Sequence, residues 1–168
     1  MAEANLLVTF DPTKIESAKK EIQERLSEIK ESAKILKIED GMAEIAVKNA
    51  KKAVSDLNKI ALKDKTKFSS TYNWIPADKW CKAKIADMQK VVKEVQEGIS
   101  QKEKWKMEIG RHKTELHERD LIIKLTEIID KPNVDLNNPE KIINVEIIKD
   151  KCAISLLKPT ESLSIGKL

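Results

Sequence analysis

Few residues of this chain have types and spacings that could support catalysis or metal binding. His112 and His117 lie five positions apart, whereas two metal ligands on one helix face prefer a spacing of four. Cys81 and Cys152 are the only cysteines, too few for a disulfide framework or, alone, for a zinc site. Glycine-rich nucleotide-binding motifs and the nucleophile elbow are absent. The sequence therefore predicts no catalytic residue, no metal site and no cofactor.

Cys81 is the best alternative candidate for chemistry. Lys79, Lys82 and Lys84 surround it in the sequence, and nearby cations lower the pKa of a thiol. No base stands beside it in the sequence, however, and a nucleophilic cysteine normally needs one. We expect both cysteines to pack as small apolar residues.

Positive charge is concentrated in one stretch of the chain. The 168 residues include 32 Lys and Arg and 28 Asp and Glu, a net charge of +4. Residues 79–113 contain ten basic and five acidic residues (+5), and residues 114–168 contain eight and ten (−2). Such a concentration attracts nucleic-acid phosphates, although a solvated helix and strand surface is the ordinary alternative. Trp105 could stack on a base, but its alternation with Met107 and Ile109 favours a core position.

The elements of the first half predict an α+β domain. Apolar runs indicate strands at residues 5–10, 35–38 and 42–47, with Asp40-Gly41 as a hairpin turn. Apolar residues at helical spacing indicate helices over residues 13–30 and 50–61. Residues 67–74 are β-prone and precede Pro76. The resulting order, β-α-β-β-α-β, predicts that residues 1–74 form a ferredoxin-like domain with its helices on one face of an antiparallel sheet.

The second half predicts another α+β unit, over residues 75–160. Asp78 is the predicted N-cap of a helix that contains Cys81 and ends at Gly98. A strand at 104–110, a helix that starts near Glu118 and strands at 142–148 and 152–157 follow, in the order α-β-α-β-β. Residues 161–168 are predicted to be a short, frayed tail.

Five segments of the second half carry a family resemblance. They are WIPADKWCKAKI, KWKMEIGRH, RDLI, VDLNNPEKIINVEII and KCAISLL, within residues 73–158. Together they resemble the THUMP domain, an RNA-binding module of tRNA-modifying proteins. The likeness is strongest to the stand-alone THUMP proteins that serve as tRNA-binding adaptors in cytidine acetylation. It implies a ferredoxin-like N-terminal domain followed by a THUMP domain.

The resemblance also implies a function. The family recognises tRNA largely by its folded shape and acceptor end. The adaptors have no catalytic centre and present tRNA to a separate RNA acetyltransferase, which acetylates a D-arm cytidine. A non-catalytic subunit of a thiolation or methylation complex is the alternative. An enzyme whose site the sequence does not reveal and a protein-interaction scaffold are two further hypotheses.

The resemblance places a basic surface at and after the first THUMP strand. Gly110 stands there where relatives often have a basic residue. Asn138-Pro139 match a family turn and are expected to shape the loop before Lys141, and Asp135 is expected to form a turn in the same loop. The predicted RNA-binding residues, which include two lysines from earlier in the basic stretch, are Lys82, Lys84, Lys104, Lys106, Arg111, His112, Lys113 and Arg119.

The expected location is the cytoplasm, without a membrane partner. No apolar run approaches the ~20 residues that a membrane-spanning helix needs. The first ten residues lack the basic and long apolar regions of a signal peptide.

Overall fold

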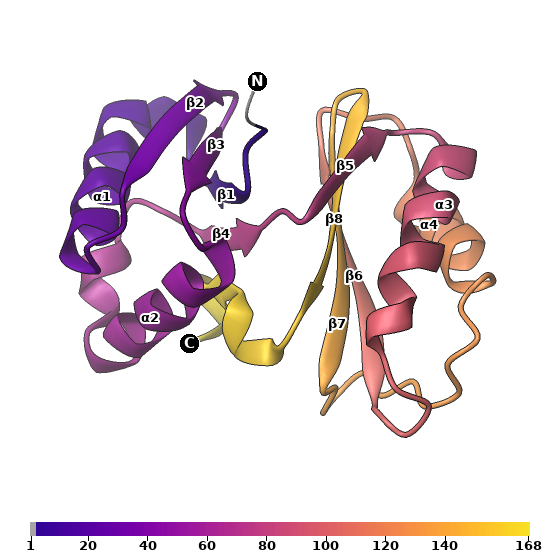
Figure 1. Ribbon diagram of the computed structural model, residues 1–168. Coiled ribbons are helices and arrows are strands. Elements are labelled where there is room, and N and C mark those ends of the chain that lie inside the picture. Colours follow the sequence, from indigo (N-terminus) through magenta and orange to yellow (C-terminus); the bar gives the residue numbers. More distant parts are fainter. Residues whose placement is uncertain (1–2) are drawn as a thin grey trace. The chain divides into compact units, whose positions relative to one another are not determined.

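The computed structural model describes residues 3–168, which form two compact units (Figure 1). Unit 1 contains the described residues up to Ala77 and also the C-terminal segment Thr160–Leu168. Unit 2 is Asp78–Pro159. The first two residues of the predicted N-terminal domain lie outside the described residues. Each unit combines two α-helices with one sheet, so the α+β class is confirmed.

Unit 1 has the predicted order of strands and helices. Its first six elements are β1 (Leu6–Thr9), α1 (Ile15–Glu28), β2 (Ala33–Glu39), β3 (Met42–Val47), α2 (Ala50–Lys63) and β4 (Asn73–Pro76). The strands lie in the order β2-β3-β1-β4, and every neighbouring pair is antiparallel. Apolar side chains of both helices share one core with β1 and β3. Therefore α1 and α2 cover the same face of the sheet (Figure 1).

Asp40 and Gly41 form the turn between β2 and β3, as the sequence predicts. Both residues have positive φ, 51° and 79°. This is the combination that a two-residue type I′ hairpin requires. A Cβ atom at Gly41 would lie 2.7 Å from the carbonyl oxygen of Phe10, so the position also has no space for a side chain.

The fourth strand starts and ends later than the sequence predicts. Lys65–Phe68 form a 3-10 turn, in which the Asp64 carboxylate accepts a hydrogen bond from the Thr66 N–H at 3.1 Å. Phe68 enters the core and meets Trp74 edge to face. The strand can include Pro76, although proline has no N–H to donate. The next N–H, that of Ala77, donates to the Asn5 carbonyl at 2.8 Å. Since the hydrogen bonds to one neighbour recur at every second residue of an antiparallel strand, the Pro76 nitrogen points away from β1.

The last residues of the chain complete the sheet of unit 1. Strand β9 (Leu163–Ser164) pairs antiparallel with β4 and extends the order to β2-β3-β1-β4-β9. Leu163 and Ile165 are buried in the core. The Asn58 amide of α2 donates to the carbonyls of Thr160 and Ser162, at 2.9 and 2.8 Å. The prediction of a frayed tail is wrong, because these two apolar side chains and the free side of β4 hold the segment in place.

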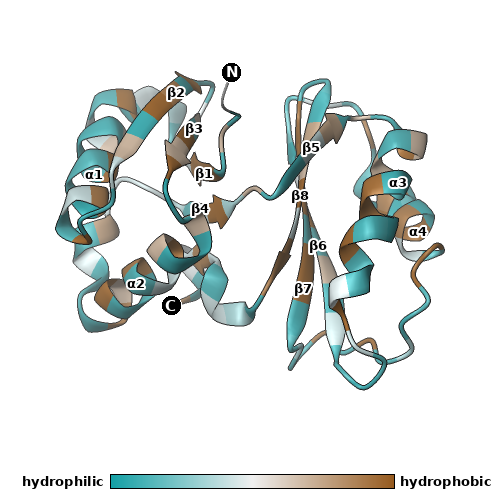
Figure 2. Ribbon diagram, viewed as in Figure 1, coloured by the Kyte–Doolittle hydropathy of each residue, from teal (hydrophilic) through white to brown (hydrophobic). Residues whose placement is uncertain are grey.

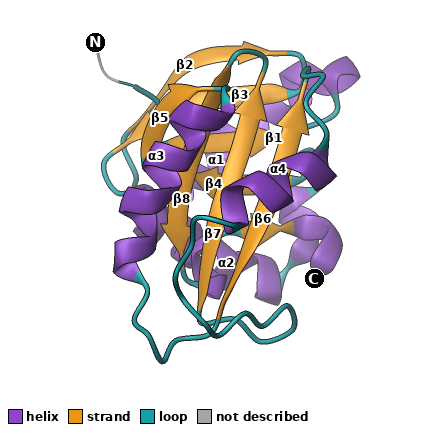
Figure 3. Ribbon diagram, turned by 90° about the vertical axis from the view of Figure 1, so that its right-hand side faces the viewer, coloured by secondary structure: helices purple, strands orange, loops and turns teal. Residues whose placement is uncertain are grey.

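Unit 2 is a second sheet with two helices on one face. Its elements are β5 (Lys79–Lys82), α3 (Ile85–Val95), β6 (Trp105–His112), α4 (Glu118–Thr126), β7 (Lys141–Ile148) and β8 (Lys151–Leu157). The strand order is β5-β8-β7-β6, in which β6 and β7 are parallel and the other pairs antiparallel. Both helices contribute to one core with the strands and lie across the same face (Figure 3). Hydrophobic and hydrophilic residues both occur along α3 and α4, as amphipathic helices require (Figure 2).

The start of unit 2 corrects one prediction. Lys79–Lys82 form a strand and not the first turn of a helix, and α3 begins only at Ile85. Asp78 therefore does not cap a helix. Its carboxylate accepts from the Leu156 N–H at 3.1 Å, and its own N–H donates to the Ser155 hydroxyl at 2.8 Å. Asp78 thus fastens the start of β5 to β8.

Trp105 belongs to the core of unit 2. Its ring is buried between the sheet and the helices, and Nε1 donates to the Lys131 carbonyl at 3.1 Å. Met107 is buried on the same face of β6. The core interpretation is confirmed, and the ring is not available for base stacking.

Among residues 3–168, no helix is both long enough and apolar enough to cross a lipid bilayer.

Candidate nucleic-acid interface

Three strands of unit 2 have their carboxyl ends at the same end of the sheet. Since β8 is antiparallel to both β5 and β7, and β6 is parallel to β7, the strands β5, β6 and β7 all run in one direction. The register places Lys82, Lys151, Ile148 and His112 in one row across the sheet. The residues that follow these strand ends therefore gather at the same end of the sheet.

This basic end contains six of the eight predicted RNA-binding residues. Lys82 ends β5, Lys84 precedes α3, and His112 ends β6 between its two basic neighbours. The Arg111 guanidinium donates to the Leu116 carbonyl at 3.1 Å, which holds the β6–α4 loop against the end of its strand. That loop leads directly to Arg119 in the first turn of α4. We define the basic end by the following residues: Lys82, Lys84, Arg111, His112, Lys113, Arg119, Lys149 and Lys151.

The sequence did not single out Lys149 and Lys151. Lys149 has a φ of 58° in the tight β7–β8 turn, and Lys151 begins β8 opposite Lys82. The Lys151 ammonium also lies 4.8 Å from the centre of the Trp80 ring, a cation–π distance. The sequence does contain a signal for these two lysines, namely the turn between its last two strand-like runs. Because that turn follows the carboxyl end of β7, its residues must lie at the same end of the sheet as the ends of β5 and β6.

Two helices begin at the basic end. The residues at their N-cap positions are Lys84 for α3 and His117 for α4, and neither side chain caps its helix by a hydrogen bond. Backbone N–H groups in a first helical turn attract anions. The first turns also contain Asp87, Glu118 and Asp120, whose charges oppose an incoming phosphate. Lysine and arginine side chains must therefore supply most of the attraction.

His112 is held by a buried carboxylate. Its Nε2 lies 2.8 Å from Oε2 of Glu146, the residue next to Gly110 on the neighbouring strand β7. The Asn144 amide donates to Oε1 of the same carboxylate at 3.2 Å. A Cβ atom on Gly110 would lie 2.0 Å from Glu146 Oε2. The absence of a side chain at Gly110 thus makes room for Glu146, and Glu146 orients His112.

The other two predicted residues, Lys104 and Lys106, lie at the opposite end of the sheet. They stand at the beginning of β6, where Trp105 pairs with Lys141 at the start of β7. The Lys106 ammonium is 2.7 Å from Glu108, and that of Lys104 is 3.7 Å from Asp135. The structure does not bring these two lysines together with the basic end.

Asp135 forms the expected turn. Its Oδ1 accepts from the N–H groups of Asn137 and Asn138, at 3.0 and 2.9 Å. These two hydrogen bonds, first that of Asn138, hold the pKa of Asp135 below its ordinary value.

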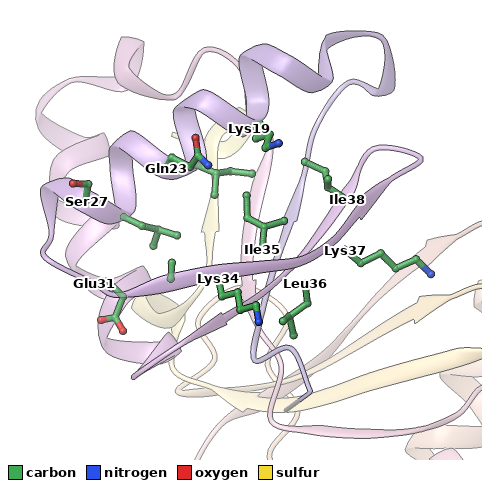
Figure 4. Close-up of a pocket in the computed structure, with 12 residues that line it drawn as sticks. Lys19, Gln23, Ser27, Glu31, Lys34, Ile35, Leu36, Lys37 and Ile38 are labelled. Atoms are coloured by element: carbon green, nitrogen blue, oxygen red, sulfur yellow. The ribbon is translucent and has the colours of Figure 1, made fainter. Parts of the chain in front are cut away.

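Unit 1 has a groove that no pattern in the sequence predicts (Figure 4). Its volume is about 700 Å³, and it lies between α1 and the edge strand β2. Ile22 and Leu26 form part of its lining, together with Ile35 and with Lys34 on β2.

Across residues 3–168, no three His, Cys, Asp or Glu side chains come together in a group that could hold a metal ion.

The second unit can be assigned to a known class of domain. The family model described as "THUMP domain" matches residues 82–157, which run from the end of β5 to the end of β8. Unit 2 therefore contains a THUMP domain, the domain that the sequence motifs indicated. Curated protein sequences give no match to this chain.

Two solved structures resemble this chain in fold. PH1313 from Pyrococcus horikoshii OT3 is 16% identical with a TM-score of 0.63, over 94% of this chain and 55% of its own. TrmN from Thermus thermophilus is 11% identical with a TM-score of 0.56, over 90% of this chain and 44% of its own. These likenesses concern the fold alone. The chain spans about half the length of each of these two solved structures.

Proposed function

We propose that this protein is a tRNA-binding adaptor of a tRNA-modification system. The observation that carries the proposal is a THUMP domain, at residues 82–157, whose strand ends gather lysine and arginine side chains at one end of the sheet. THUMP domains are RNA-binding modules of tRNA-modifying proteins, as the sequence resemblance already implied. The basic end is the proposed contact surface.

The side chains at the basic end suit the recognition of an RNA backbone. Lysine ammonium groups engage phosphates without reading bases. An A-form helix hides its major-groove base edges, so shape and 2′-OH contacts dominate its recognition. Arg111 and Arg119 can each make two parallel hydrogen bonds to one phosphate. We therefore expect recognition of the folded shape of tRNA and not of a short sequence.

The finer proposal concerns the partner. The protein would hold tRNA for a separate RNA acetyltransferase, which acetylates a D-arm cytidine, and would itself have no catalytic centre. The family resemblance supports this choice. A non-catalytic subunit of a thiolation or methylation complex is the alternative. The strand order β2-β3-β1-β4 with two helices on one face supports a ferredoxin-like unit 1, the N-terminal companion that the resemblance implies.

A binding experiment tests the tRNA-binding proposal. Arg111→Ala with Lys113→Ala should weaken the binding of the full chain to unmodified tRNA about tenfold or more, because one hydrogen bond to a charged group contributes about 1.5–3 kcal/mol. Lys59→Ala with Lys63→Ala removes the same charge from exposed positions on α2 and serves as the control. Fluorescence anisotropy gives both affinities. Equal weakening by the two pairs would contradict a binding surface at the basic end.

A nucleoside analysis tests the partner. tRNA from cells that lack this protein should lose acetylated cytidine, and the wild-type gene should restore it, whereas the Arg111→Ala, Lys113→Ala gene should not. Loss of a thiolated or methylated nucleoside instead would favour the alternative complex. If the purified protein acetylated tRNA in the presence of acetyl-CoA and ATP but without a partner protein, the result would contradict a non-catalytic role.

A further inference from the structure

The two cysteines of the chain, 71 positions apart, lie opposite each other in unit 2. Cys81 of β5 and Cys152 of β8 are direct register partners. Two positions further along, the Ala83 N–H donates to the Asp150 carbonyl at 2.9 Å. Because hydrogen-bonded pairs recur at every second residue of an antiparallel ladder, Cys81 and Cys152 also form such a pair, with Cα atoms about 5.5 Å apart. This separation lies within the range of about 4.4–6.8 Å that disulfides span.

Both thiols point to the helix-covered face of the sheet, but solvent reaches them unequally. Cys152 is fully buried in the core of unit 2, and Cys81 lies half-buried at the rim of that core. A hydrogen bond between the two thiols lowers the pKa of Cys81. The same hydrogen bond, together with burial, raises the pKa of Cys152. Cys81 is thus the accessible and more acidic thiol, and Cys152 is the protected one behind it.

We propose that Cys81 and Cys152 form a redox-reactive thiol pair that hydroperoxides oxidise to a cross-strand disulfide. The Cys81 thiol loses its proton, and the thiolate attacks one oxygen of hydrogen peroxide, so that an S–O bond forms and the O–O bond breaks. The released proton neutralises the departing hydroxide, which leaves a sulfenic acid and one water. The Cys152 sulfur then attacks the Cys81 sulfur, its proton passes to the departing hydroxyl, and a second water leaves. Two thiols and one peroxide give one disulfide and two waters.

The strand pairing makes this disulfide easy to reverse. Cβ atoms of directly opposed residues lie about 4.5–5.5 Å apart, which is at or beyond the disulfide range of about 3.5–4.5 Å. The bond would therefore form under strain, and strained disulfides are readily reduced. It would fasten the short edge strand β5 to β8 immediately beside Lys82 and Lys151. The proposal does not depend on the proposed function.

Two reagents test the pair on the folded full chain. Treatment with hydrogen peroxide should remove both free thiols, lower the intact mass by two hydrogen atoms and yield one peptide that links residues 81 and 152. A dithiol should restore both thiols. Phenylarsine oxide, a trivalent arsenical that bridges two neighbouring thiols, should bind the reduced protein one to one and block the oxidation.

Single variants identify the roles of the two residues. In Cys152→Ser, Cys81 should still react with peroxide but stop at the sulfenic acid. In Cys81→Ser, the substitution is at the half-buried position. The remaining thiol, that of the buried Cys152, should react with neither reagent until the protein is unfolded. Circular dichroism checks that each variant is folded. Disulfide-linked dimers of the wild type, or reaction of its thiols only in denaturant, would overturn the proposal.

Discussion

At the scale of single residues, Gly110 and Glu146 fit against each other across β6 and β7. The buried Glu146 carboxylate occupies the space that a side chain at position 110 would fill. It then orients His112, the last residue of β6. The lack of a basic side chain at position 110 therefore reflects the packing of an acid beside the proposed contact surface.

Gly110→Ala tests this fit. The new methyl group must displace a buried, hydrogen-bonded carboxylate, so we expect a loss of about 1–3 kcal/mol in the free energy of unfolding. Urea denaturation measures it. Gly166→Ala is the matched control, because no atom beyond the glycine itself and its two chain neighbours lies within 4 Å of the position that its Cβ would occupy. A Gly110→Ala protein as stable as the control would contradict the structural role.

At the scale of elements, two segments outside the helices and the longer strands are held by specific contacts. Strand β9 pairs with β4 through only two residues, yet it places Leu163 in the core of unit 1. The loop before β7 depends on the Asp135 carboxylate, which accepts two backbone hydrogen bonds. Each segment gives a prediction.

Leu163→Ala should destabilise unit 1 by about 2–5 kcal/mol, the usual cost of truncating a fully buried leucine. Leu62→Ala provides the control, because the Leu62 side chain on α2 is 73% exposed. Urea denaturation followed by tryptophan fluorescence is informative because Trp74 is the register partner of Leu163. If both variants unfold at the same urea concentration, the segment is not part of the core.

Asp135→Asn should lower the free energy of unfolding near neutral pH but not in acid. Backbone N–H groups lower the pKa of Asp135 from 3.8 in the folded state, so its charge stabilises the fold above that pH. This contribution decreases as the pH falls through the lowered folded pKa, where the wild type becomes protonated. The stability difference between wild type and Asp135→Asn should therefore be constant near neutral pH and vanish in acid. A difference that persists in acid would show that the carboxylate charge is not its cause.

At the scale of the whole molecule, charge density along the sequence differs from charge density in space. The stretch 79–113 has a net charge of +5. However, Lys104 and Lys106 lie at one end of the sheet, and Arg111 and Lys113 lie at the other. Acids pair with several of its lysines, as Glu94 does with Lys79 at 2.9 Å. Lys149 and Lys151, from outside the stretch, join the basic end.

The salt dependence of tRNA binding tests this redistribution. Each phosphate contact that is lost should reduce the slope of log affinity against log salt by about 0.7–0.9. Lys149→Ala with Lys151→Ala should therefore reduce the slope by up to about twice that amount. Lys104→Ala with Lys106→Ala should leave the slope unchanged. The reverse result would place the contact surface at the other end of the sheet.

Local patterns in the sequence determined most of the elements. Helical spacing of apolar residues, the Asp40-Gly41 turn and the alternation around Trp105 each act over a few residues, so each can be recognised without knowing the fold. The same patterns failed at Asp78 and at residues 161–168. There the decisive partners, Ser155 and Leu156 in one case and β4 in the other, are distant in sequence.

Tertiary structure alone decided which residues share a site. Strand direction and register place Lys82, Lys151 and His112 in one row, although 69 positions separate the first two. The same register sets Cys81 opposite Cys152. Hydrogen bonds between strands fix such neighbours, and a one-residue shift would turn every side chain to the opposite face. The sequence thus specified the strands and their residues, and the pairing of those strands assembled the basic end and the thiol pair.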